Sequence, residues 1–490
     1  MTTLFPLRAD SKRALPDPLL VAAALLLVLV MPNPAGYVGG GGDDFYYVQA
    51  ARCVALHGWC VPETHWAARW PLVAPMGAAF AIFGDGRWQG ALVPFGYSLM
   101  ALLFFVRIVE DVWGRATALV GGIAFVATAS FAKGLLQPNV ETIELAWIMA
   151  AAWAGRRAMV ATARPVLWAA VAGICLGLAI QTRMTSLAWL PILGIGVFLF
   201  PGRHRHLALP ALLGTAIPIG ADMLINWHIA GDALLSQHLS IAHTRIASSE
   251  LPAWVDRSRS PLFNPQFIAG WAPAVCIHTH WTIQGVVNLL LNPQMGPVLL
   301  AASLLLFLAR KTLTWRSPEA LLAGAALLYT GALIYALAID PKARMFLPTA
   351  ALAAALVGRL GVVLWHSGER VLVGIMLAGL VTVGTIETAK RFDMGKAGPL
   401  AARWANEHKG DVAVEDATRR FLTFDATVRG LPVWPAGTSR VLVLIAGECA
   451  SSPVAKTSGP LVRSAYFGRK NDPLNLCEFR RVGPAELTHP

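Results

Sequence analysis

The stretch Gly39-Gly40-Gly41-Gly42-Asp43-Asp44-Phe45-Tyr46-Tyr47 follows the first long apolar segment of a chain that is otherwise mostly hydrophobic. Carboxylates beside a membrane segment are costly to keep, so two adjacent ones indicate a functional site. The simpler interpretation is that Asp43 and Asp44 cap a helix beginning near Phe45, where the helix dipole favours negative charge. A helix cap needs only one of the two carboxylates. The pair therefore indicates the acidic part of a functional site.

The composition around this stretch identifies the class of protein. Of 490 residues, 56% are hydrophobic and 14% are charged, whereas soluble domains have roughly 25% charged residues. Apolar runs recur from Leu19 to Thr388, and runs of about 20 residues are typical of membrane-spanning helices and not of barrel strands. The sequence therefore predicts an all-α polytopic membrane protein.

The charged residues indicate how the chain crosses the membrane. The net charge of +12 comes from Lys and Arg in short links between apolar runs, a pattern that reports topology and not nucleic-acid binding. Basic links alternate with uncharged or acidic ones, which predicts about eleven crossings with the N-terminus in the cytoplasm and the C-terminus outside. A cleaved signal peptide is disfavoured, because the first apolar run ends in Pro-Asn-Pro.

This topology divides the chain into two domains. Residues 1–389 form the predicted membrane domain, with external loops at 33–88 and 230–292. Within the first loop, the apolar segment from Leu72 to Phe83 is too short to cross, which predicts an interfacial or re-entrant helix. Residues 390–490 form the second domain.

The second domain has a different sequence character. The segments Asp411 to Glu415, Gly430 to Trp434 and Arg440 to Ala446 are typical of short strands, and Pro399 to His408 is typical of a helix. A small soluble α/β domain on the periplasmic side is expected. It has no Gly-rich phosphate loop, so we assign it an accessory role in stability or acceptor handling.

The cysteines agree with the predicted orientation. Cys53 and Cys60 share the first external loop, and Cys449 and Cys477 share the C-terminal domain. Both pairs would lie where oxidation is permitted, so disulfides are expected in them. The two other cysteines are expected to be ordinary small hydrophobic residues. No Cys-x-x-Cys or His-x-x-x-His spacing indicates structural zinc.

The predicted topology also places a set of charged side chains at the outer ends of helices. This set is Asp43, Asp44, Glu141, Glu144, Arg183, Lys342 and Arg344. An Asp there can remove a proton from an acceptor hydroxyl, and a second carboxylate can position the acceptor, hold a cation or raise the pKa of the first. Lys and Arg can hold a phosphate. Transfer of a sugar from a lipid phosphate fits these groups.

Structural interpretations remain open for three of these residues. Glu141 and Glu144 span four positions of one helix start, where acidic residues stabilise the helix. Arg183 can be an anchor that extends its charge to the membrane interface. The set forms a site only if helices distant in sequence meet.

These residues resemble the motifs of the GT-C membrane glycosyltransferases, which include protein O-mannosyltransferases and lipid A aminoarabinose transferases. The segment Asp43 to Tyr47 is similar to their acidic motif after the first membrane helix. Thr64 to Leu72, with the short apolar helix after it, is similar to their Arg-x-Pro-rich segment. Glu141 matches an acidic second external loop, and Lys342 to Pro348 is similar to a basic-aromatic-x-x-Pro element. The C-terminal domain resembles only the general habit of such enzymes to carry a periplasmic appendage.

The resemblance implies an inverting glycosyltransferase, hexosyl or pentosyl, that uses a polyprenyl-phosphate-linked sugar. Asp43 would be the catalytic base. Asp44 stands where Glu is common, so its reach is one methylene shorter. The second-loop acid is matched to Glu141, with Glu144 as the competing alignment.

The resemblance also implies the substrate-binding residues and the partners. The candidate substrate-binding residues are His65, Arg69, Glu144, Arg183, Lys342 and Arg344. Among them Arg69, Lys342 and Arg344 suit the donor phosphate. A divalent cation is left open as a cofactor, because its use varies within the superfamily. The expected acceptor is a lipopolysaccharide or other glycolipid, a polysaccharide or a protein, and the expected location is the cell inner membrane with the active site on the periplasmic side.

Two other functions remain as alternatives. A transporter or flippase for a lipid-linked sugar would use the same charges along a translocation path. No hydropathy repeat relates the two halves, and the acids gather at one face, which both weigh against transport. A non-catalytic scaffold would tolerate loss of the acids.

Overall fold

The computed structural model describes most of the membrane part of the chain and the strands of its C-terminal part. The described residues are 15–31, 43–160, 163–192, 205–250, 286, 289–311, 313–314, 317–336, 343–389, 406, 412–414, 430–432, 440–446, 455–462 and 474–480.

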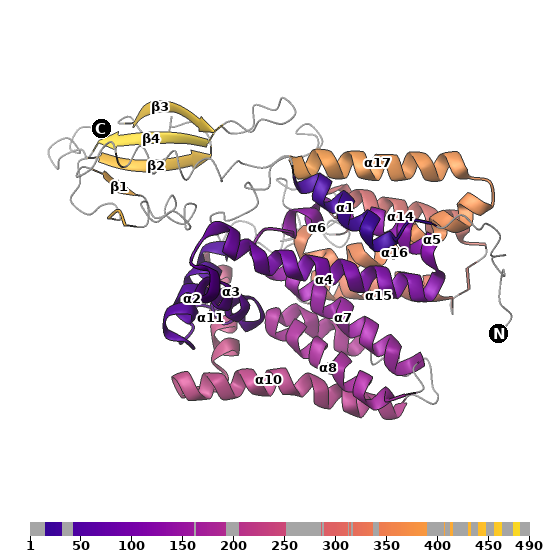
Figure 1. Cartoon of the computed structure of the whole chain (residues 1–490), viewed down its shortest axis with the longest axis horizontal. Coiled ribbons are helices and arrows are strands. Elements are labelled where there is room, and N and C mark those ends of the chain that lie inside the picture. Colours follow the sequence, from indigo (N-terminus) through magenta and orange to yellow (C-terminus); the bar gives the residue numbers. More distant parts are fainter. Residues whose placement is uncertain are drawn as a thin grey trace.

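Helices make up the membrane part, and most of the long ones run in a common direction (Figure 1). The first half contains α1 (Pro18–Val30), α2 (Asp43–His57), α3 (Trp70–Phe83), α4 (Arg87–Trp113), α5 (Arg115–Val126), α6 (Ala129–Gly134), α7 (Val140–Val160) and α8 (Pro165–Thr182). The second half contains the short helices η2 (Met184–Ala188) and η3 (Arg205–Leu207), then α10 (Ala208–Ala230), α11 (Leu235–Glu250), α14 (Gly296–Ala309), α15 (Pro318–Gly331), η4 (Ala332–Ala336), η5 (Ala343–Phe346), α16 (Leu347–His366) and α17 (Arg370–Ala389).

Six helices in the described part of the chain are long and apolar enough to cross a membrane. They are Arg87–Trp113, Pro165–Thr182, Arg205–Ala230, Pro318–Tyr335, Ala343–His366 and Arg370–Ala389. Four further apolar helices, α1, α3, α5 and α14, are shorter than 18 residues, and a span needs about 20. The multi-pass character is confirmed, whereas the count of eleven is not; most of the sixth predicted crossing falls in 193–204, outside the described residues.

The helices that carry the acidic stretch are fixed by an apolar cluster of their own. Tyr47 of α2, Leu72 and Met76 of α3, and Ile143 of α7 are each at most 1% exposed and pack together. Burial of each such side chain stabilises the fold by about 1.5–3 kcal/mol. The cluster therefore holds the start of α2 beside the start of α7, although the two are about a hundred residues apart.

Glycines set the spacing of α8 and α10. A Cβ added to Gly173 would collide with the backbone of Ala211, and one added to Gly177 would meet the carbonyl oxygen of Thr215 at 2.5 Å. In return, a Cβ on Gly214 would collide with the carbonyl of Ala170. Small residues let membrane helices approach closely, so these two backbones lie in direct contact.

The far end of α2 is fixed by two links. Cys53 and Cys60 form a disulfide, as the sequence predicted, with Cα atoms 6.1 Å apart. Arg52 pairs with Asp85 through a hydrogen bond of 2.7 Å, which joins α2 to the turn between α3 and α4. Cys175 is a buried free thiol, as expected for a small hydrophobic residue.

The described strands of the C-terminal part form one sheet of order β1-β2-β4-β3. They are β1 (Val412–Val414), β2 (Arg440–Ala446), β3 (Ala455–Val462) and β4 (Leu474–Arg480). β1 is parallel to β2, and the other pairs are antiparallel, with Arg440 opposite Arg480.

Several predictions for the C-terminal part can be compared with these strands. The strand predicted over Arg440 to Ala446 is present, and the one predicted over Asp411 to Glu415 is shortened to β1. Residues 430–432 are not a strand. The predicted helix from Pro399 to His408, apart from residue 406, and the partner Cys449 lie outside the described residues, so the α/β domain and the second disulfide remain predictions.

Candidate active site

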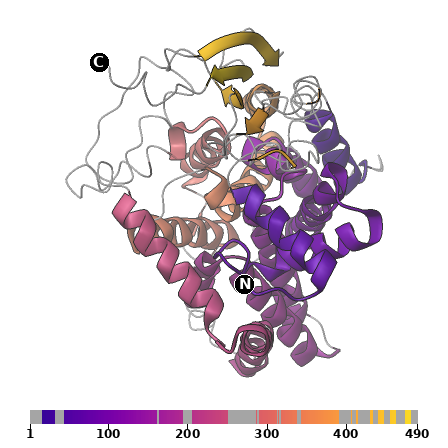
Figure 2. The same cartoon turned by 90° about the vertical axis from the view of Figure 1, so that its left-hand side faces the viewer.

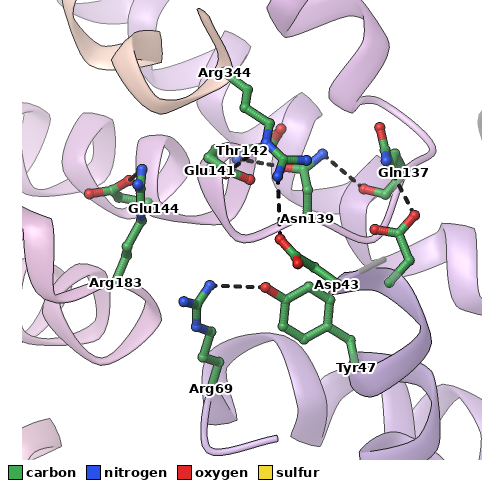
Figure 3. A network of polar contacts seen from close by, with 11 residues as sticks. Asp43, Tyr47, Arg69, Gln137, Asn139, Glu141, Thr142, Glu144, Arg183 and Arg344 are labelled. Atoms are coloured by element: carbon green, nitrogen blue, oxygen red, sulfur yellow. Dashed lines mark hydrogen bonds and ion pairs between the residues drawn. The ribbon is translucent and has the colours of Figure 1, made fainter. Parts of the chain in front are cut away.

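Asp43 and Asp44 occupy the first two positions of α2 and point in different directions. Side chains of successive helix residues diverge by about 100°. Asp43 lines a cavity, whereas Asp44 is only 3% exposed and its Oδ2 accepts a hydrogen bond of 3.2 Å from Gln137 Nε2. The two carboxylates therefore have separate duties: one faces the cavity and the other joins α2 to the loop before α7 (Figure 3).

The cavity has a volume of about 570 Å³, within the range of about 300–1,000 Å³ typical of small-molecule sites. Its lining includes residues of α2 and α11, and these two helices lie at the same end of the bundle in Figure 1. Viewed from that end, α11 stands on the opposite side from α2 and α3 (Figure 2). The titratable residues that line the cavity are Asp43, His65, Arg69, Glu141, Arg183 and Arg344.

Arg344 of η5 lies between the two carboxylates of the cavity (Figure 3). Its NH2 is 3.3 Å from Asp43 Oδ2, and its Nε is 3.2 Å from Glu141 Oε1. Glu141 is 4% exposed, so its charge needs a nearby cation. The Asp43 pair is more than one-third exposed on both sides and contributes at most about 1 kcal/mol. A ligand can therefore displace Asp43 from Arg344 more easily than it can displace Glu141.

A second ion pair holds Arg183 at the cavity wall. Arg183 follows the last residue of α8, and its NH1 is 3.6 Å from Glu144 Oε2. Glu144 Oε1 also accepts hydrogen bonds from Thr185 Oγ1 at 3.0 Å and Ser186 Oγ at 2.6 Å. Glu144 is fully buried and does not line the cavity. It acts on the cavity through Arg183.

Arg69 is oriented by a hydrogen bond to α2. Its NH1 donates to Tyr47 Oη at 2.9 Å. Burial raises the pKa of Tyr47 well above its ordinary range, against the lowering effect of Arg69, and nearby carboxylates raise it further. The phenol therefore stays neutral at physiological pH. His65 also lines the cavity and packs against the ring of Trp66, with centroids 3.9 Å apart.

The loop before α7 positions Glu141. Asn139 precedes the helix, and its Oδ1 accepts a hydrogen bond of 2.9 Å from the backbone N–H of Thr142. Asn139 Nδ2 donates to the carbonyl oxygen of Gln137 at 3.1 Å. Asn is a favoured N-cap residue, so Asn139 starts α7 and places Glu141 in its first turn. Gln137, which donates to Asp44, belongs to the same segment.

The structure brings together six of the nine predicted site residues. These are Asp43, His65, Arg69, Glu141, Arg183 and Arg344. Asp44 and Glu144 lie behind the cavity wall, and Lys342 is outside the described residues. The catalytic and binding roles of all nine residues remain predictions.

The sequence reasoning missed Tyr47, Asn139 and the α11 side chains of the cavity. Asn139 carried an available signal, because Asn immediately before a helical pattern indicates an N-cap. Tyr47 and α11 carried none, since their contacts depend on packing.

The divalent cation left open by the sequence has no preformed cluster of ligands among the described residues. In the described parts of the chain, no three or more His, Cys, Asp or Glu side chains gather. The two cavity carboxylates instead share Arg344, whose guanidinium supplies positive charge between them.

The chain was compared with a family model and with solved structures. Residues 71–221 match the model of the dolichyl-phosphate-mannose-protein mannosyltransferase family. The chain resembles the crystal structure of the Archaeoglobus fulgidus oligosaccharyltransferase in complex with Zn and sulfate, with a TM-score of 0.54 at 15% identity, over 84% of this chain and 61% of that one. The apo form of that protein gives a TM-score of 0.52 over 85% and 60% of the chains at the same identity. The chain thus spans about three-fifths of the archaeal protein's length.

ArnT from Cupriavidus metallidurans in the apo state is also similar, at 16% identity over 96% of this chain and 98% of that one, with a TM-score of 0.43. No curated protein sequence matches the chain.

The fold and the cavity define a multi-pass membrane protein with an acidic and basic site at one end of its helices. The family match covers residues 71–221, and the likeness to the archaeal structures shows a shared fold.

Proposed function

We propose that the chain is an inverting glycosyltransferase that moves a sugar from a polyprenyl-phosphate donor to an acceptor outside the cytoplasm. One observation carries the proposal: Asp43, Glu141 and Arg344 reach one cavity from α2, α7 and η5. The matched family's name, with its lipid-phosphate-linked mannose, supports a donor of this chemical class. The acceptor is a glycolipid, a polysaccharide or a protein, and the expected location is the inner membrane.

In this mechanism Asp43 is the general base. Its side chain is 36% exposed within the cavity, so an acceptor hydroxyl can reach it. Asp43 takes the hydroxyl proton while the acceptor oxygen attacks the anomeric carbon. The bond between that carbon and the phosphate oxygen breaks on the opposite side, and the polyprenyl phosphate leaves with the electron pair. Attack from the opposite side inverts the anomeric centre.

Arg344 receives the donor phosphate. A guanidinium has five N–H donors and matches phosphate in a bidentate manner. The bound phosphate competes with Asp43 for Arg344, while buried Glu141 keeps its contact with the guanidinium. Donor binding therefore frees the carboxylate that acts as the base. Arg183 and Arg69 add positive charge along the same cavity.

The rest of the lining suits the lipid part of the donor. Ile180, Met184, Leu187, Ile219 and Met345 line the cavity together with the charged groups. An apolar strip beside charged groups suits an amphipathic ligand, which has a polar head and an apolar chain. The phosphate would lie at the charged wall and the first isoprene units along these residues.

Reconstituted vesicles test the proposal and separate it from transport. The purified protein is supplied with undecaprenyl phosphate carrying a radiolabelled sugar, and the release of free undecaprenyl phosphate is measured. A transferase releases it in step with acceptor labelling, whereas a flippase moves the intact donor across the bilayer and releases none. Movement of intact donor without release would refute the proposal.

The variant Arg344→Lys gives a second test. Lys keeps the charge but loses the bidentate fork. Binding of undecaprenyl phosphate should weaken by about ten- to a hundredfold, in line with the 1.5–3 kcal/mol typical of a hydrogen bond to a charged group. Unchanged affinity would remove Arg344 from the phosphate site.

A further inference from the structure

The cavity has a second wall, formed by α11, that differs in chemistry from the charged one. Ser236, Gln237 and Ser240 of α11 line it, and all three side chains are uncharged hydrogen-bonding groups. In the view from the end of the bundle, α11 stands across from α2 and α3 (Figure 2). A ligand in the cavity would therefore lie between a charged wall and a neutral one.

The sequence after α10 turns the chain back to build this wall. Gly231 ends α10 with φ of 70°, a left-handed conformation that glycine adopts without strain. Asp232 follows, and its Oδ1 accepts a hydrogen bond of 2.9 Å from Leu234 N. Asp232 Oδ2 also contacts His238 Nδ1 at 2.8 Å, one turn into α11. This short turn sets the direction in which α11 leaves the bundle.

A buried polar cluster then holds α11 against α10. Ser236 Oγ donates to Asp222 Oδ1 at 3.2 Å, and Asn226 Nδ2 donates to Ser236 Oγ at 2.9 Å. Asp222 is 3% exposed and Asn226 is fully buried. Polar and ionisable residues inside a membrane-spanning helix are expensive to keep and usually serve function. The mechanism above uses neither residue, and their shared contact is the cavity-lining Ser236.

The neutral wall has the chemistry that recognises a sugar ring. Amide and hydroxyl groups exchange hydrogen bonds with sugar hydroxyls as donors and acceptors. Gln237 Oε1 is buried and has no hydrogen-bond partner among the described residues, so a ligand hydroxyl would relieve an unsatisfied acceptor.

We propose that Gln237 and Ser240, on a helix held by Asp222 and Ser236, bind the hydroxyls of an uncharged sugar ring and select the sugar that enters the cavity. The inference rests on the proposed function, because the ring belongs either to the lipid-linked donor or to the acceptor glycan. Gln237 and Ser240 are contact residues, and Asp222 is a positioning residue that acts through Ser236.

Binding measurements in lipid nanodiscs test the contact residues. The affinity for undecaprenyl phosphate is compared with the affinity for undecaprenyl phosphate carrying glucose or mannose. Gln237→Ala should reduce the gain in affinity due to the sugar by about fivefold, as expected for one hydrogen bond. The affinity for undecaprenyl phosphate itself should stay unchanged. Ile241→Ala, a change at an exposed position of the same helix outside the cavity lining, is the control.

A conservative pair tests the positioning residue. Asp222→Asn keeps an oxygen acceptor for Ser236 and should retain the sugar-dependent gain, whereas Asp222→Leu and Ser236→Ala should lose it as Gln237→Ala does. Undecaprenyl phosphate binding by each variant reports that the rest of the site is folded. Equal behaviour of Asp222→Asn and Asp222→Leu would refute the positioning role.

A competition arm identifies the source of the ring. Methyl α-glucoside and methyl α-mannoside are tested as free acceptor-like rings against the donor-loaded protein. Loss of their binding in Gln237→Ala, with the donor gain intact, assigns the wall to the acceptor glycan. If neither ligand's affinity changes in any α11 variant, the proposal is wrong. If the wild-type protein binds neither undecaprenyl phosphate nor its sugar conjugates, the proposed function itself fails, and the two failures are thereby distinguished.

Discussion

Replacing Asp43 by Asn removes one negative charge and one proton acceptor from the cavity while the side chain keeps its size. General-base catalysis contributes about 10²–10⁴-fold to rate, which equals about 3–5 kcal/mol of transition-state stabilisation. We expect the rate of sugar transfer to fall by that factor.

The same change should affect folding only slightly. The ion pair of Asp43 with Arg344 is more than one-third exposed on both sides, so its loss removes at most about 1 kcal/mol. Arg344 keeps Glu141 at 3.2 Å and stays neutralised. Activity and stability should therefore separate, with a large loss of rate and a melting temperature close to that of the wild type.

The assay uses vesicles with saturating donor, and it measures single-turnover transfer together with undecaprenyl phosphate binding. Asp85→Asn is the matched control, because it makes the same chemical change in an Asp–Arg pair, with Arg52 at 2.7 Å, outside the cavity lining. Transfer by Asp43→Asn at the wild-type rate would refute Asp43 as the base. If Asp43→Asn lost lipid binding as strongly as it lost rate, the substitution would have disordered the site. The expectation that folding is only slightly affected would then be wrong.

Three further predictions concern the groups around the base. Glu144→Gln should destabilise the fold by about 3–5 kcal/mol, because Arg183 becomes a buried charge without its counter-ion. Thermal unfolding in detergent measures this loss of stability, and the double variant Glu144→Gln with Arg183→Met should regain part of it. Cys53→Ser should lower stability by about 2–3 kcal/mol, the entropy of a short closed loop, and a reducing agent should have the same effect on the wild type only. Burial raises the pKa of Tyr47, so on raising the pH the unfolded chain releases this proton before the folded chain does. The stability that Tyr47 contributes is therefore complete below about pH 10 and falls as the pH rises further. Melting temperatures measured against alkaline pH should fall less in Tyr47→Phe than in the wild type, and an identical pH dependence would contradict the assignment.

Much of the site was predictable from residue type and position. Asp43, Glu141 and Arg344 stood out because charges at the ends of apolar helices are costly. Their convergence was not predictable, since it depends on Tyr47, Leu72 and the rest of the apolar cluster that joins α2, α3 and α7. Hydropathy reports that a helix is buried but not which helix covers it.

The boundaries of helices were harder to predict than their existence. In the first external loop the sequence predicted a short apolar helix from Leu72 to Phe83, which is present as α3, whereas a helix near Phe45 was only an alternative and is present as α2. The mean polarity of α2 hides it from hydropathy, because its buried side, with Tyr47 and Val48, is narrow. The count of crossings was likewise limited by helices such as α1 and α14, of 13 and 14 residues, which composition alone does not separate from full spans.

The direct contact between α8 and α10 has a consequence for how selectivity can change. α8 ends at Thr182, directly before Arg183 of the charged wall, and α10 leads into α11 of the neutral wall. The distance between these two backbones therefore affects the gap between the walls. A single methyl group at Gly177 would meet the carbonyl of Thr215 and push the two helices apart, although Gly177 does not line the cavity. Sugar preference can thus be retuned, in evolution or by engineering, through residues that never touch the sugar.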